Sequence, residues 1–176
     1  MNRPLLRAFA LIFLVGLGGC GLNEFDVTQS GSAAVAGGGI TAGLLGTFPP
    51  VQGFNDFDFS QSQQFKNENA HKDHVSTAKL TSFELKIDAP ANGDFGFLDS
   101  IAFYAEANGQ KVRVAHKENI GALPSSSTLS LDLDDVDLAP FVRADTMSIT
   151  TAANGRQPVN DTHLTATAVF HVSVSL

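Results

Sequence analysis

The sequence has no tryptophan, one tyrosine and one cysteine among its 176 residues. A single cysteine cannot form a disulfide within the chain, so a folded domain has to be stabilised by packing. Fourteen phenylalanines supply most of the large side chains for that packing. Acidic residues outnumber lysine and arginine by 18 to 11. An acidic chain repels phosphate backbones, which excludes nucleic acid from the expected partners.

Sequence motifs of enzymes are also missing. There is no Gly-x-Ser-x-Gly sequence, no catalytic cysteine and no pair of carboxylates at an interpretable spacing. The glycine-rich residues 37–46 are not followed by Gly-Lys-Ser/Thr, so they do not indicate a phosphate-binding loop. These absences favour a protein without catalytic activity.

The first 20 residues have the composition of an export signal. Arg3 and Arg7 form a short basic segment, residues 5–17 are mostly apolar, and two glycines then precede Cys20. This order is typical of a cleaved secretory signal, whose apolar part forms a helix. An uncleaved membrane anchor fits less well, because the apolar run is shorter than the ~18–20 residues that cross a bilayer.

The tetrad Leu17-Gly18-Gly19-Cys20 resembles the lipobox of bacterial lipoproteins. The resemblance is limited to these first residues and implies cleavage between Gly19 and Cys20, with a diacylglycerol on the Cys20 thiol and usually an acyl chain on the freed amine. Two or more acyl chains anchor a protein stably. An ordinary signal peptide with an unrelated cysteine is the alternative, but the only cysteine of the chain lies where a lipobox requires it. No other cofactor is expected.

The same resemblance implies a location in the cell envelope. In the sorting rule of enteric lipoproteins an aspartate after the cysteine favours the inner membrane, so Gly21 favours the outer membrane of a host with two membranes. Cleavage would leave 157 residues and change the net charge from −7 to −9. Binding to anionic lipid headgroups by charge is therefore disfavoured, and the acyl chains would hold the protein to the membrane.

Composition divides the remaining chain into two parts. Residues 20–53 are rich in glycine, alanine and serine, which predicts a lipidated tether with one short strand over residues 24–28. Residues 54–176 are predicted to form the folded domain. Its first segment, residues 54–65, contains alternating phenylalanines, read as a strand whose aromatic row belongs to the core rather than to a ligand or glycan platform.

Alternating apolar and polar residues predict further strands at 83–87, 97–105, 112–114, 129–138, 147–151 and 164–176. Asn108-Gly109 predicts a tight hairpin, because both residues tolerate positive φ. The segments 147–151 and 164–176 are expected to form a closing hairpin, with the last one a central strand. Seven or eight antiparallel strands predict an all-β, immunoglobulin-like sandwich; a small barrel is the alternative.

Two acidic or histidine-containing segments could bind metal. His71 and His74, with Asp73 between them, would ligate zinc if they lay on one helical turn. The sequence shows no obvious further ligand nearby, and a solvated loop is the alternative. The aspartates of residues 132–137 could form a calcium-binding site. The alternation instead places Asp132 and Asp134 on a solvent-facing strand surface.

Three functions remain compatible with the sequence. The favoured one is a non-enzymatic interaction or structural module, anchored by lipid, that contacts a protein or an envelope polymer. The alternatives are a small-ligand carrier with a cavity lined by phenylalanines, and a metal-dependent hydrolase that uses His71, Asp73 and His74.

Overall fold

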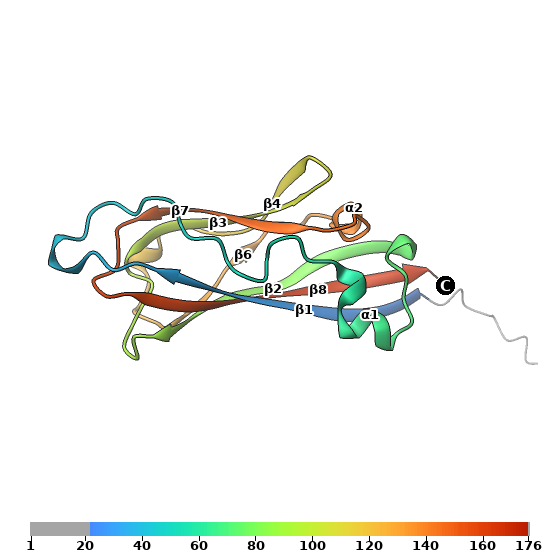
Figure 1. Cartoon of the computed structure of the whole chain (residues 1–176), viewed down its shortest axis with the longest axis horizontal. Coiled ribbons are helices and arrows are strands. Elements are labelled where there is room, and N and C mark those ends of the chain that lie inside the picture. The colour runs from blue at the N-terminus through green and yellow to red at the C-terminus, as the bar shows by residue number, and fades with distance from the viewer. Residues whose placement is uncertain (1–21, 176) are drawn as a thin grey trace, which may run out of the picture.

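Two antiparallel sheets of four strands each lie face to face in the computed structural model, which describes residues 22–175 (Figure 1). The first sheet has the order β1-β8-β2-β5 and the second has the order β6-β4-β3-β7. Neither sheet closes on itself, so the predicted antiparallel β-sandwich is confirmed and the barrel alternative is wrong. The predicted signal helix lies outside the described residues.

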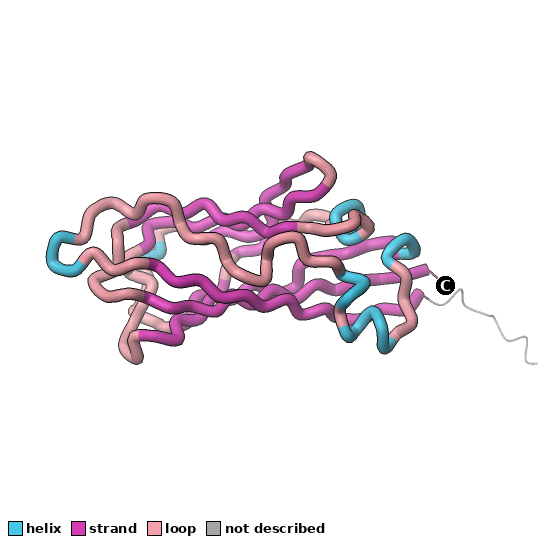
Figure 2. Tube along the Cα trace, in the orientation of Figure 1, coloured by secondary structure: helices cyan, strands magenta, loops and turns pink. Residues whose placement is uncertain are grey.

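The strands are β1 Leu22–Val35, β2 Val75–Ala89, β3 Leu98–Ala107, β4 Gln110–Lys117, β5 Thr128–Ser130, β6 Asp132–Leu133, β7 Ser148–Gly155 and β8 Thr162–Ser175. The helical turns are η1 Gly39–Thr41, η2 Phe59–Gln61, α1 Gln63–Asn67, η3 Lys72–His74, η4 Ile120–Ala122 and α2 Ala139–Val142. They are short and lie between the strands (Figure 2).

The C-terminal strand β8 is central, as its regular alternation predicts. It pairs with β1 on one side and β2 on the other. Its inward side chains are all buried: Leu164, Ala166, Ala168, Phe170, Val172 and Val174. In an immunoglobulin sheet the first strand pairs with the second; here β8 lies between them.

Only one of the two predicted hairpins is present. Asn108 and Gly109 have φ values of 50° and 74° and connect β3 to β4. The closing hairpin prediction is wrong, because β7 belongs to the second sheet and β8 to the first. The backbone leaves β7 at Gly155, where Arg156 N donates to Phe97 O at 2.7 Å, and then crosses between the sheets.

The prediction of a glycine-rich tether is wrong for the described part of residues 20–53. The first strand extends over Leu22–Val35, well beyond the expected 24–28, and pairs with β8 along its whole length. Phe48 and Val51 are buried in the core. Composition misled here because Gln29 and Gly31 interrupt the apolar residues on the inward face of β1, which weakens its apolar signal.

Residues 48–57, which we call the strap, close one open side of the sandwich. Ser32 and Gln52 exchange backbone hydrogen bonds of 3.0 and 2.7 Å, and Phe57 and Met147 exchange a second pair. Phe54 is fully buried between these two attachment points. The strap therefore joins β1 to the residue that precedes β7. Residues 54–65 form bends and short helices instead of the predicted strand.

On the opposite side, the chain closes the sandwich by passing from the first sheet to the second, which we call the change of sheet. Leu129 lies in β5 of the first sheet and Leu133 in β6 of the second, while Leu131 between them donates from its backbone to Phe83 O at 3.0 Å. The predicted single strand over 129–138 is therefore two short strands and a turn. Asp137 remains exposed, but its Oδ1 also accepts from the backbone nitrogens of Ala78 and Ala139, both at 3.0 Å.

Candidate functional site

Four connecting segments meet at the end of the sandwich farthest from Leu22. They are residues 36–47, 90–97, 118–127 and 156–161, called here the distal loops. Strand pairing places them together, because Val35 and Ala89 face Thr162 and His163 on neighbouring strands, and Leu98 faces Gly155. In Figures 1 and 2 they form the left-hand end. Binding residues concentrate in such loops when a rigid scaffold positions them.

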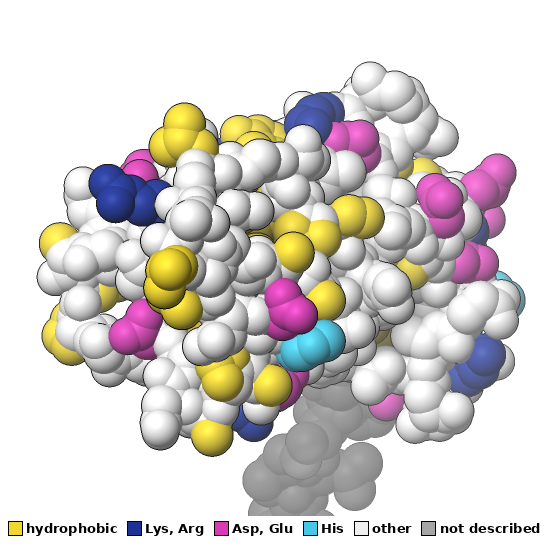
Figure 3. Space-filling view, turned by 60° about the vertical axis from the view of Figure 1, so that its left-hand side comes forward, with side chains coloured by type: hydrophobic (Ala, Val, Ile, Leu, Met, Phe, Trp, Pro, Cys, Tyr) yellow, Lys and Arg dark blue, Asp and Glu magenta, His cyan; other side chains and the backbone are white. Residues whose placement is uncertain are grey.

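Three aliphatic side chains on the distal loops point into solvent. Ile40, Leu44 and Val159, called here the apolar tip, have exposed fractions of 103, 85 and 63%. Figure 3 turns this end toward the viewer and shows separate groups of hydrophobic side chains on it. Exposed apolar side chains at one end of a molecule can form part of an interaction site.

The backbone that carries the apolar tip is hydrogen-bonded across two loops. Gly39 N donates to Val159 O at 3.1 Å, and Gln157 N donates to Gly43 O at 3.0 Å. Asp161 adds a third connection by accepting from Gly37 N at 2.8 Å. The tip is thus displayed on a connected pair of loops.

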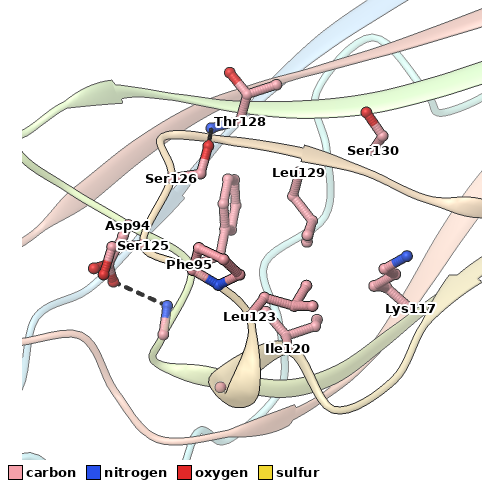
Figure 4. A pocket seen from close by; sticks show the side chains of 13 residues that line it. Asp94, Phe95, Lys117, Ile120, Leu123, Ser125, Ser126, Thr128, Leu129 and Ser130 are labelled. Carbon is pink, nitrogen blue, oxygen red and sulfur yellow. Dashed lines mark hydrogen bonds between the residues drawn. The ribbon is translucent and has the colours of Figure 1, made fainter.

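A pocket of about 390 Å³ opens beside the tip, between the other two distal loops and β5. Four apolar side chains converge in it: Phe95, Ile120, Leu123 and Leu129 (Figure 4). Three of them belong to the core and are 3–6% exposed, whereas Leu123 is 42% exposed. The apolar floor is therefore fixed by the core, and Leu123 forms a partly solvated wall.

The charged groups at the pocket already have partners. Lys117 Nζ lies 2.9 Å from Asp132 Oδ1, and Asp94 accepts from Gly96 N at 2.9 Å. The remaining polar groups of the rim are hydroxyls, including Ser126, whose Oγ accepts from Thr128 N at 3.1 Å. An accepting hydroxyl keeps its own proton free to donate.

The predicted metal ligands lie at the other end of the sandwich, at η3 just before β2. The rings of His71 and His74 approach each other, with centroids 5.9 Å apart. Asp73 lies between them on η3 and no further ligand joins them, since residues 22–175 contain no group of three His, Cys, Asp or Glu side chains arranged to hold a metal. His171, on β8, contacts Asp26 on β1, with Nδ1 2.9 Å from Oδ1.

Gly19 and Cys20, the predicted cleavage and lipidation residues, lie outside the described residues. Within residues 22–175 no helix is long and apolar enough to cross a bilayer. No protein-family model matches the chain, and no curated protein sequence matches it.

No local sequence pattern predicts the pocket. Gly121 and Pro124 are residues typical of a loop, and Phe95 follows Asn92-Gly93, which is typical of a turn. Leu129 was expected to be an ordinary core residue. The pocket depends on how these three segments meet at a sheet edge, and no local pattern encodes that meeting.

Next to the pocket, an ion pair supports the change of sheet. Asp134 accepts two hydrogen bonds from Arg113 of β4, at 2.8 and 3.0 Å, and His116 Nδ1 lies 3.6 Å away. The hydrogen bonds from Arg113 hold the pKa of the Asp134 carboxyl below its usual value, although partial burial opposes this. Asp134 therefore stabilises the fold above its unfolded-state pKa of about 4, and this contribution is lost as the pH falls through the lower folded-state pKa.

We expect D134N to lower the free energy of unfolding at pH 7 by less than about 1 kcal/mol, because the pair is partly solvated. The difference from the wild type should shrink at pH 3. Urea denaturation at the two pH values measures it. D132N is the matched control, since Asp132 is more exposed at 59% and pairs with a single lysine. A difference that grows at low pH would contradict this assignment.

Proposed function

We propose that the protein is a lipid-anchored, non-enzymatic module of the cell envelope that binds a partner protein through its apolar tip. The observation that carries the proposal is the position of Ile40, Leu44 and Val159 at the end of the sandwich farthest from Leu22. Cys20 precedes Leu22 by two residues, so a lipid on its thiol would lie within about 7 Å of the start of β1.

The length of β1 supports this arrangement. At about 3.3 Å per residue, a strand of 14 residues extends for about 45 Å. An anchor at the Leu22 end would therefore direct the distal loops away from the membrane surface, where a partner can reach them. The proposed location is the outer membrane, on the basis of Gly21.

The chemistry of the tip favours a protein partner over a polysaccharide. Aliphatic side chains gain about 25 cal/mol for each Å² of apolar surface removed from water. Sugar-binding surfaces would use exposed aromatic rings, and the large hydrophobic residues exposed among the described residues are Ile40, Leu44, Leu123 and Val159. Three of these four form the apolar tip.

The anchor and the interaction are tested together. The native membrane-extracted protein should have lost residues 1–19 and gained acyl mass, and Cys20→Ala should abolish both changes. A photoreactive benzoylphenylalanine in place of Ile40 should cross-link a protein in the anchored wild-type background. The same group in place of Gln110, at the exposed β3–β4 turn, is the matched control.

Each part of the proposal has its own contrary result. An uncleaved or unacylated native protein would refute the anchor. Equal cross-linking from positions 40 and 110, or none from position 40, would refute the role of the tip.

A further inference from the structure

The pocket beside the tip has the form of a small-molecule site. Its floor is made by core side chains of three separate segments, Phe95, Ile120 and Leu129, so its shape does not depend on one mobile loop. Its volume of about 390 Å³ lies within the range of about 300–1,000 Å³ found for ligand sites. A mainly apolar concavity with a few polar groups at the rim is the usual composition of such sites.

The rim selects against anionic ligands. An anion at Lys117 would have to compete with Asp132, and Asp94, which accepts from the backbone donor of Gly96, keeps its negative charge and would repel an anion. Figure 4 shows the amino group of Lys117 at the periphery, away from the converging apolar side chains. An anionic ligand would therefore lose hydration without finding an unpaired counter-ion.

The hydroxyls of the rim suit a neutral polar group. Ser125, Ser126, Thr128 and Ser130 all line the pocket, but the hydroxyls of Thr128 and Ser130 point away from the apolar floor, which leaves Ser125 and Ser126 to face a ligand (Figure 4). Ser126 already accepts a hydrogen bond, which leaves its proton available for an oxygen of the ligand. The half-exposed side chain of Leu123 would be covered by the apolar part of the same molecule.

We propose that this pocket binds a small uncharged amphipathic molecule, with its apolar part against Phe95, Ile120, Leu123 and Leu129 and its neutral polar group at the serine rim. The site is separate from the apolar tip, because it is lined by the 90–97 and 118–127 loops and β5. It does not depend on the proposed partner protein, so either proposal can fail alone.

The single cysteine makes a direct test possible. With Cys20 the only natural cysteine, and acylated in the proposed mature protein, S126C introduces one free thiol at the pocket rim and L44C introduces one at the tip. Both variants, as full-length protein in its native membrane, are reacted with neutral N-phenylmaleimide and with its para-carboxylate analogue. The ratio of the two rates at one thiol is independent of the thiolate fraction there.

We divide the rate with the neutral reagent by the rate with the carboxylate reagent at each thiol. This ratio is expected to be at least about five times as large for S126C as for L44C, which corresponds to a preference of the pocket for the neutral reagent of about 1 kcal/mol. The rate for S126C with the neutral reagent should also level off with concentration, because binding precedes reaction. S125C is a second rim position in case S126C disturbs the turn at Thr128.

Equal ratios at rim and tip, with linear concentration dependence at both rim positions, would overturn the proposal. A higher ratio for the carboxylate reagent at the rim would also overturn it, because that result would identify an anion site at Lys117. If L44C alone showed saturation, the apolar ligand would belong to the tip and not to the pocket.

Discussion

Phe170→Ala is expected to lower the free energy of unfolding by about 3–5 kcal/mol, which is a large part of the stability of a domain of this size. Phe170 is fully buried at the middle of the central strand β8. Its ring meets that of Phe59 edge to face at a centroid distance of 5.2 Å, and the ring of Phe57 lies at 6.5 Å. The substitution would leave a cavity between the first sheet and residues 57–59.

Urea denaturation followed by far-UV circular dichroism measures this loss. Val169→Ala is the matched control, because Val169 is the neighbouring residue on β8 and faces outward, half-buried. The control should lose less than about 1 kcal/mol, the span of strand preferences at such positions. Similar losses in both variants would mean that β8 does not bury the face described here.

Phe48→Ala is expected to have a comparable effect, about 3–5 kcal/mol, because Phe48 is only 4% exposed at the start of the strap. Leu44→Ala, four residues earlier, should change the stability by no more than about 0.5 kcal/mol, because Leu44 is 85% exposed. Urea denaturation of the two variants beside the wild type measures the free energy of unfolding that each substitution removes. If both substitutions were silent, residues 36–53 would behave as the flexible tether that their composition suggests.

The sequence predicts the parts of the fold that depend on local patterns. The alternation over residues 164–176 predicts β8 and its buried face, and Asn108-Gly109 predicts the β3–β4 turn, because positive φ at both positions is a local requirement. These features need no knowledge of which strands are neighbours.

The features that the sequence does not predict are set by distant contacts. Gly31 illustrates this, since a Cβ at that position would collide with the backbone oxygen of Gln52 where the strap crosses β1. The glycine is required by close approach, yet in the sequence it looks like part of a flexible segment. The change of sheet at Leu131 is equally hidden, because the alternation of leucines continues through it.

The candidate sites also differ in whether a local sequence pattern predicts them. His71, Asp73 and His74 form a recognisable local pattern, but a metal site would need a further ligand from elsewhere in the fold, and the described residues contain no group of three side chains arranged to hold a metal. The pocket has no local pattern and arises where three separate segments meet.

The central position of β8 also has a consequence for the order of synthesis. Among the described strands Thr162–Ser175 comes last along the chain, yet β1 and β2 are joined in one sheet only through it. A growing chain can therefore hold both of these strands before the strand that joins them exists. The first sheet is completed only once β8 has been synthesised.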